Sequence, residues 1–169
     1  MLKELISKEK IKKRVKELGQ EISTDYAGKE ILMVVLLRGS FIFAADLIRE
    51  LTADTVVNFM VVSSYQGEQS SGEVRILKDL AENIHEREVL IVEDIVDTGL
   101  TLNKILELLR SRSPKSISIC SMLNKPSRRM QPVDIQYIGF EVQDQFVVGY
   151  GLDIDQKYRQ LPYVGEIIE

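Results

Sequence analysis

Three acidic residues stand together in an otherwise apolar segment, VLIVEDIVDTGLTL (residues 89–102). Glu93, Asp94 and Asp97 follow a run of apolar residues, and a Thr-Gly-Leu-Thr turn (residues 98–101) comes directly after them. Like charges this close repel one another, and the turn supplies no counter-charge. Carboxylates suit sugar hydroxyls, Mg²⁺ or a proton, so the segment predicts a site that an outside ligand completes.

The turn after the acids is suited to a phosphate group. A helix that begins there exposes backbone N–H groups without intrahelical partners and the positive end of its dipole. Gly99 lets a ligand approach the backbone, and the hydroxyls of Thr98 and Thr101 are further donors. A ribose 5-phosphate combines one phosphate with sugar hydroxyls. The alternative is that Thr98 only caps the helix while the acids complement its dipole, which the repulsion among three clustered carboxylates disfavours.

Strands and helices alternate through the middle of the chain, and this pattern decides where such a site must lie. Continuous apolar runs predict buried parallel strands at residues 31–37, 55–64 and 89–94. Shorter strands are expected at residues 73–77, 116–123, 134–140 and 146–148. Helical spacing of apolar residues predicts helices near residues 8–27, 40–51 and 101–111, with Ser7 as the first N-cap. The pattern predicts a three-layer α/β fold with a mainly parallel sheet, which binds ligands at the carboxyl ends of its strands.

Composition narrows the class of protein. The 169 residues suit a single domain, and the net charge of -4 lacks the basic footprint of a nucleic-acid-binding protein. Cys120 is the single cysteine, which suits a reducing compartment. No apolar run approaches the roughly 20 residues of a membrane span, and the first residues lack the features of a signal peptide. We therefore expect a cytoplasmic protein that binds neither nucleic acid nor membrane.

Residues 89–102 closely resemble the phosphoribosyl pyrophosphate signature of type I phosphoribosyltransferases: four apolar residues, two acids, two variable positions, then acid-Thr-Gly-x-Thr. From about residue 31 to residue 165, the chain is similar to the bacterial hypoxanthine-guanine branch of that family. The further matching stretches are LRGS (37–40), SSY (63–65), LNKPSRR (123–129), FVVGYGLD (146–153) and YRQLPYVG (158–165). The resemblance implies one domain over residues 1–169, a lid at about 65–75, and a small hood from the N-terminal and C-terminal segments.

The resemblance also implies a reaction. The family transfers the 5-phosphoribosyl group of phosphoribosyl pyrophosphate to hypoxanthine or guanine, gives IMP or GMP plus pyrophosphate, and requires Mg²⁺. Glu93 and Asp94 match the pair that holds the ribose hydroxyls and the metal, and Asp97 matches the general base at purine N7. The residues that match the 5-phosphate turn are Thr98, Gly99, Leu100 and Thr101. Leu100 departs from the Gly or Lys of many relatives, which removes any side-chain role there.

Other matching residues lie far from that segment. Those that match further substrate contacts are Arg38, Gly39, Ser64, Tyr65, Lys125, Phe146, Val147 and Arg159. Lys125 would donate to the purine O6, Phe146 would stack on the base, and Asp153 would contribute to the metal site. Taken alone, Lys125 reads as an exposed basic turn and Phe146 as a core residue. Ile154 replaces an aromatic residue of the family beside Asp153.

Two other functions are compatible with parts of the sequence. A regulatory protein on the same fold would bind phosphoribosyl pyrophosphate to control nucleic-acid binding, but it should carry a basic face or an added binding segment. A receiver-type phosphotransfer domain would use an acidic cluster at strand ends, but it does not explain the Thr-Gly-Leu-Thr turn. We expect an enzyme of purine salvage, and the resemblance suggests a homodimer or a homotetramer.

Overall fold

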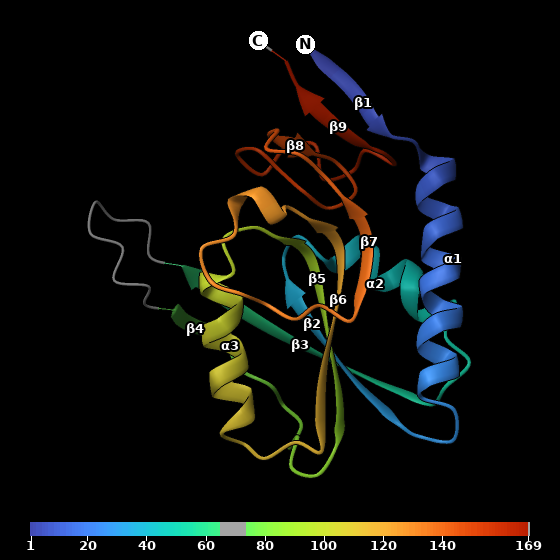
Figure 1. The fold of residues 1–169 in the computed structure, drawn as a ribbon, viewed down its shortest axis with the longest axis vertical. Helices are drawn as coiled ribbons and strands as arrows, with labels where there is room; N and C mark the ends of the chain where they lie inside the picture. The colour runs from blue at the N-terminus through green and yellow to red at the C-terminus, as the bar shows by residue number, and fades with distance from the viewer. Residues whose placement is uncertain (65–73, 169) are drawn as a thin grey trace.

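The computed structural model describes residues 1–64 and 74–168 (Figure 1). The elements follow one another as β1 (Leu2–Ile6), α1 (Lys8–Asp25), β2 (Ile31–Leu37), α2 (Phe41–Ile48), β3 (Thr55–Ser64), β4 (Val74–Lys78), β5 (Glu88–Val96), α3 (Leu100–Arg110), β6 (Ser116–Asn124), the 3-10 helix η1 (Pro126–Arg128), β7 (Tyr137–Glu141), β8 (Val147–Val148) and β9 (Val164–Ile167). The predicted mobile loop at residues 65–72 lies outside the described residues.

The central sheet has six strands in the order β4-β3-β2-β5-β6-β7 (Figure 1). Strand β2 pairs in parallel with β3 and β5, and β6 continues the parallel arrangement to β7. Among the described strands of this sheet, only β4, at one edge, runs antiparallel to its neighbour. The mainly parallel sheet confirms the predicted fold class.

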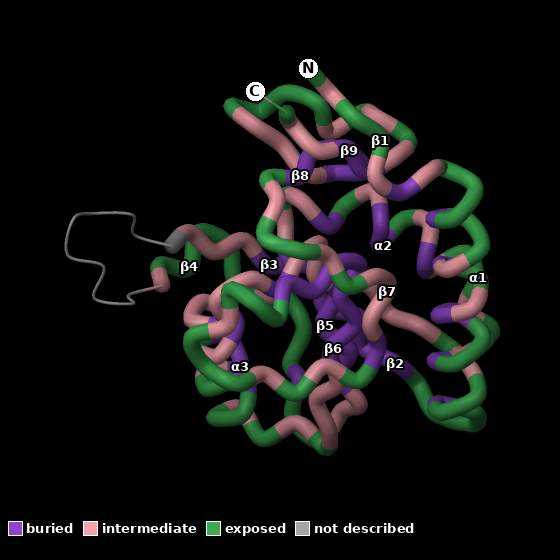
Figure 2. The backbone as a smooth tube through the Cα atoms, turned by 45° about the horizontal axis from the view of Figure 1, so that its top comes forward, coloured by how far each residue is buried: buried purple, intermediate pink, exposed green. Residues whose placement is uncertain are grey.

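Strand β2 shows why the apolar runs of the sequence form buried strands. Met33 and Val35 pack into a core cluster with α1 and α2, while Leu32 and Val34 pack into a second cluster with α3. Successive side chains of a strand point to opposite faces, so a strand covered by helices on both faces must be apolar at every position. The buried residues accordingly gather on the central strands (Figure 2).

The two ends of the chain build a second sheet. It has three strands in the order β1-β9-β8, and β1 pairs antiparallel with β9 so that Leu2 lies opposite Ile167. Both termini therefore lie side by side at one end of the molecule (Figure 1). The terminal segments thus form a separate small unit, although neither β1 nor β9 has a strand signal in the sequence.

Helix α1 follows its predicted boundaries closely. The Ser7 hydroxyl accepts a hydrogen bond from the Lys10 backbone N–H at 3.2 Å and caps the first turn, as predicted. Within the helix, the Arg14 guanidinium donates to the backbone carbonyl of Ile138 at 2.7 Å and joins α1 to β7. No described helix combines the length and apolar character needed to cross a membrane.

Candidate functional site

The predicted phosphate turn lies between the end of β5 and the start of α3. Gly99 has a φ of +81°, and a Cβ atom there would lie 2.5 Å from the backbone oxygen of Gln131. A side chain at this position would be both strained and obstructed, so the turn requires glycine. The Leu100 backbone N–H donates to the Thr98 hydroxyl at 3.3 Å, and the Asn103 N–H donates to the Gly99 carbonyl at 3.0 Å as the first hydrogen bond of the helix.

The first two acids form a compact pair at the carboxyl end of β5. The Asp94 backbone N–H donates to Oε1 of Glu93 at 3.0 Å, and the Ile95 N–H donates to Oδ1 of Asp94 at 2.7 Å. Burial of the Glu93 carboxyl group raises its pKa well above the usual value, and the charge of Asp94 adds to this effect. The same burial makes the ionised form of Glu93 costly, and a ligand that brings hydroxyl donors or positive charge would offset that cost.

The turn after β2 lies directly against this acidic pair. A Cβ atom on Gly39 would lie 1.6 Å from Oδ2 of Asp94, and one on Gly151 would lie 2.1 Å from the backbone oxygen of Gly39. Gly151, with a φ of +101° and backbone in the way, requires glycine, whereas a side chain at position 39 would displace the Asp94 carboxylate. The peptide bond that precedes Arg38, between Leu37 and Arg38, is cis. The predicted pyrophosphate turn and the predicted ribose-binding acids are thus neighbours.

Asp97 is paired with Arg128, which was not among the predicted site residues. Arg128 Nε lies 3.2 Å from Oδ1 of Asp97, and Arg128 Nη1 lies 3.4 Å from Oδ1 of Asp144. Arg129 Nε donates to the backbone oxygen of Asp97 at 3.0 Å. Both arginines belong to the matching stretch LNKPSRR (123–129), so the sequence could have indicated them, but only Lys125 of that stretch was predicted to contact the substrate.

Lys125 is not an exposed basic residue. It follows β6 directly, and its backbone N–H donates to the Val96 carbonyl at 2.9 Å, which places it beside the end of β5. The residue is 8% exposed, and its ammonium group donates to the backbone carbonyl of Gln145. Phe146 comes next along the chain and is 55% exposed, while Val147 is buried. The solvent-facing ring of Phe146 departs from the core position that a strand phenylalanine usually takes.

Arg159 and Asp153 are held together in the segment that follows β8. Arg159 Nη2 lies 3.0 Å from Oδ1 of Asp153, and Arg159 Nη1 donates to the Gly151 carbonyl at 2.6 Å. The other oxygen of Asp153 accepts the Gln156 backbone N–H at 2.8 Å. Of the two predicted residues from β3 and the following loop, Ser64 ends β3 and Tyr65 lies outside the described residues.

The carboxylates predicted to hold Mg²⁺ do not make a protein-only metal site. Across residues 1–64 and 74–168, no group of three or more His, Cys, Asp or Glu side chains is arranged to hold a metal ion. Mg²⁺ is commonly bound by one or two carboxylates together with substrate phosphates and water. The adjacent oxygens of Glu93 and Asp94 fit that mode of binding, with the phosphate-binding turns beside them.

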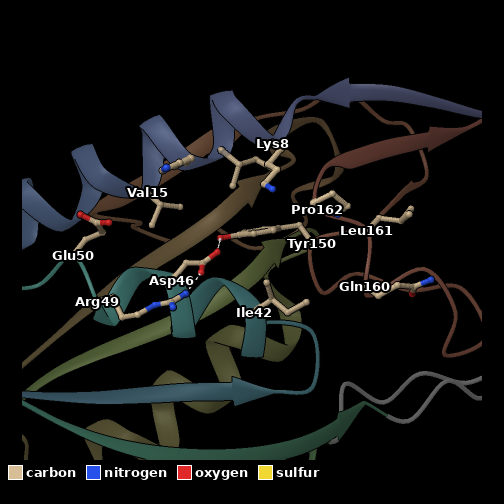
Figure 3. A pocket seen from close by; sticks show the side chains of 12 residues that line it. Lys8, Val15, Ile42, Asp46, Arg49, Glu50, Tyr150, Gln160, Leu161 and Pro162 are labelled. Carbon is tan, nitrogen blue, oxygen red and sulfur yellow. Dashed lines mark hydrogen bonds and ion pairs between the residues drawn. The ribbon is translucent and has the colours of Figure 1, made fainter.

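A cavity of about 630 Å³ lies apart from these residues, between α1, α2 and the segment after β8 (Figure 3). The Tyr150 hydroxyl donates to Oδ2 of Asp46 at 2.6 Å, and the other Asp46 oxygen contacts Arg49 Nη2 at 2.5 Å. Burial of Tyr150, together with its hydrogen bond to Asp46, raises the pKa of the phenol. This contact joins α2, which starts from the turn at Gly39, to the segment that carries Gly151.

Comparison with known proteins identifies similar chains. Residues 1–155 match the phosphoribosyl transferase domain family. The hypoxanthine phosphoribosyltransferase of Escherichia coli K12 is 50% identical over 167 residues, which cover 97% of this chain and 94% of that protein. The hypoxanthine-guanine phosphoribosyltransferase of Mycobacterium avium is 47% identical over 170 residues, with 96% of this chain and 84% of that protein covered. The crystal structure of a hypoxanthine phosphoribosyltransferase from Staphylococcus aureus superimposes with a TM-score of 0.95 and 45% identity, over 98% of this chain and 91% of that chain.

Proposed function

This chain belongs to the phosphoribosyltransferase family, and we propose that it transfers the 5-phosphoribosyl group of phosphoribosyl pyrophosphate to hypoxanthine or guanine in purine salvage. The products are IMP or GMP and pyrophosphate. The observation that carries the proposal is the stack of Asp94, Gly39 and Gly151, in which a Cβ on Gly39 would lie 1.6 Å from the Asp94 carboxylate. It brings acceptors for ribose hydroxyls next to backbone that a pyrophosphate can approach.

The sugar and its phosphate are assigned to the end of β5 and the turn after it. Glu93 and Asp94 accept the ribose hydroxyls, because ionised carboxylates are acceptor-only groups. The 5-phosphate binds the N-terminal turn of α3, where free N–H groups and the helix dipole favour an anion. The residues assigned to this turn are Thr98, Gly99, Leu100 and Thr101. Leu100 contributes its backbone here and not its side chain.

The pyrophosphate is assigned to the turn after β2 and to the segment after β8. Arg38 and Arg159 supply guanidinium groups, which bind phosphate oxygens in a defined geometry. Gly39 lets the leaving group approach the backbone. Because the bond from the ribose to the pyrophosphate breaks during transfer, negative charge gathers on the leaving group, and cations fixed beside it stabilise the transition state.

The purine is assigned to the space between β5, Lys125 and Phe146. Asp97 takes the proton from purine N7 as the ribose bonds to the base. The Lys125 ammonium donates to O6, which favours 6-oxopurines over adenine, and Phe146 stacks on the ring. The 55% exposure of Phe146 leaves its ring available for such a contact. Val147 offers backbone groups to the base edge.

The metal assignment follows from the chemistry of the donors. Glu93, Asp94 and Asp153 would hold Mg²⁺ together with substrate oxygens, directly or through water. When bound, Mg²⁺ supplies positive charge that neutralises the pyrophosphate. Oδ1 of Asp153 is already ion-paired with Arg159 and Oδ2 accepts the Gln156 N–H, so a contact through water suits this residue.

We assign residues 1–169 to one phosphoribosyltransferase domain that works in the cytoplasm as a homodimer or homotetramer. Exposed apolar side chains on neighbouring elements support association: Phe41 of α2 is 44% exposed, Phe59 of β3 41% and Leu77 of β4 58%. Light scattering of the purified chain checks the oligomer, and a monomer across the working concentration range would refute it.

A coupled assay tests the function directly. Phosphoribosyl pyrophosphate and Mg²⁺ are supplied with hypoxanthine, guanine, xanthine or adenine, and pyrophosphate release is followed for each base. Turnover with hypoxanthine or guanine is expected. Turnover with adenine alone would contradict the assigned contact between Lys125 and O6. Turnover with none of the bases would contradict the proposed enzymatic function and favour a phosphoribosyl pyrophosphate-sensing regulator.

A further inference from the structure

Arg38 and Arg159 reach one acceptor from distant parts of the chain. Arg38 Nη1 and Arg159 Nη2 each lie 3.0 Å from Oε1 of Gln156. Two guanidinium groups drawn to one point repel each other, and a neutral acceptor between them offsets part of that repulsion. We propose that Gln156 is a positioning residue that holds both cations at the pyrophosphate site before the substrate arrives. This inference rests on the function proposed above.

The backbone at Gln156 is unfavourable for glutamine. Ile154 and Lys157 exchange backbone hydrogen bonds of 3.2 and 2.9 Å around the two-residue turn Asp155-Gln156. Asp155 has a φ of +50° and Gln156 a φ of +65°. Positive φ at both central positions is the pattern of a type I′ turn, in which the second position strongly prefers glycine. At this unfavourable position, the Gln156 side chain contacts both arginines.

Hydrogen bonds and an ion pair connect the turn at Gln156 to Asp153 and Arg159. The Gln156 backbone N–H donates to Oδ2 of Asp153 at 2.8 Å, and Oδ1 of the same carboxylate contacts Arg159 Nη2 at 3.0 Å. Arg159 is further fixed through the Gly151 carbonyl at 2.6 Å, and only 18% of its side chain is exposed. Arg38 is the exposed partner, so the Gln156 amide oxygen is the contact that brings it to Arg159.

The arrangement leaves donors free for a ligand. A guanidinium carries five N–H groups, and the Gln156 oxygen takes one from each arginine. The remaining N–H groups of Arg38 can meet phosphate oxygens while the contact to Gln156 persists. Holding the long Arg38 side chain in its bound position reduces the conformational entropy lost on binding. Gln156 should therefore increase the affinity for pyrophosphate.

Calorimetric titration with Mg²⁺-pyrophosphate tests the role on the full chain. Gln156→Ala removes the amide, and Gln156→Gly removes it while giving the turn its preferred residue. Both should raise the Kd for pyrophosphate by about threefold to tenfold, the effect of one freed side chain. The KM for phosphoribosyl pyrophosphate should rise in parallel while kcat changes little. Gln160→Ala, an exposed glutamine farther along the same segment, is the matched control and should bind as wild type does.

The glycine variant separates a ligand role from a folding role. If Gln156 mattered only for the turn, Gln156→Gly would bind pyrophosphate at least as well as wild type, since the turn favours glycine. Gln156→Glu keeps an acceptor for both arginines but adds negative charge, so it should raise the Kd beyond the alanine variant. An affinity in Gln156→Ala or Gln156→Gly equal to or tighter than wild type would overturn the positioning role.

The two proposals fail in different ways. If wild type neither binds pyrophosphate nor turns over a purine, the proposed function fails. If wild type does both and the Gln156 variants match it, only the role of Gln156 fails. In an Arg159→Gln background, Gln156→Ala should have little further effect, because the pair that it holds together is already broken. Full additivity of the two changes would contradict the proposal.

Discussion

Arg128 Nε lies 3.2 Å from Oδ1 of Asp97, the carboxylate assigned to the proton transfer. Through its contact with Asp144, the same guanidinium joins the phosphate turn to the segment that leads into Phe146. One oxygen of Asp97 is therefore engaged by a cation, and the second remains for the purine. The pair is solvent-exposed on both sides, so its effect is on the orientation of the carboxylate more than on stability.

Asp97→Asn should lower kcat by about 10²-fold or more, because an amide cannot accept the purine proton. Binding of phosphoribosyl pyrophosphate should be nearly intact, since the ribose acids and the phosphate turn are unchanged. Single-turnover kinetics and titration of the donor substrate measure the two effects. Asp144→Asn is the matched control, because it contacts Arg128 at 3.4 Å but takes no part in the proton transfer. An unchanged kcat, with chemistry rate-limiting, would remove Asp97 from this role.

Gly99→Ala should destabilise the protein more than Gly28→Ala does. Both glycines have positive φ, +81° and +75°, so alanine strains the backbone by about 1–2 kcal/mol at either position. At Gly28 a Cβ would meet nothing within 4 Å, whereas at Gly99 it would lie 2.5 Å from the Gln131 oxygen. Urea denaturation measures both variants. Gly99→Ala should also raise the KM for phosphoribosyl pyrophosphate, and equal stability losses would contradict the predicted clash.

The parallel strands and the acidic strand end were predictable because their signals are local. Strand β2 matches its predicted residues 31–37, since burial on both faces demands apolar side chains at every position, and β3 matches its predicted residues 55–64. The family was also predictable, because the spacing of Glu93, Asp94 and Asp97 relative to the glycine turn is contained in one short segment.

Contacts between distant segments were not predictable in the same way. The stacking of Gly151 on Gly39, the pairing of Arg128 with Asp97 and the meeting of two arginines at Gln156 depend on tertiary register. Strands β1 and β9 were missed because each forms through tertiary pairing, β1 with β9 and β9 with both β1 and β8. The roles of the site residues remain predictions that the experiments above test.

Tyr150→Phe should reduce the free energy of unfolding by about 1.5–3 kcal/mol, the range for a hydrogen bond to a charged group. The ring still fills its buried position beside the cavity of Figure 3, but Asp46 loses the donor that lay 2.6 Å away. Urea denaturation at neutral pH measures the loss. Tyr163→Phe is the control, because the Tyr163 hydroxyl makes no hydrogen bond within residues 1–64 and 74–168. Equal stability of the two variants would show that the contact to Asp46 contributes nothing.

The ion pair between Asp79 and Arg112 predicts how stability responds to acid. Arg112 donates to both oxygens of Asp79, at 2.8 and 2.7 Å, and these hydrogen bonds lower the pKa of Asp79 below its usual 3.8. A carboxyl group with a lowered folded pKa stabilises the protein above its unfolded pKa, and this contribution is lost as the pH falls through the folded pKa.

Arg112→Gln should therefore reduce the free energy of unfolding by about 0.2–1 kcal/mol at neutral pH, the range for solvent-screened pairs. The difference from wild type should shrink below about pH 4, as Asp79 becomes protonated. Urea denaturation of both proteins between pH 7 and pH 3 measures this difference, and a gap that widens with acid would contradict the assigned pair.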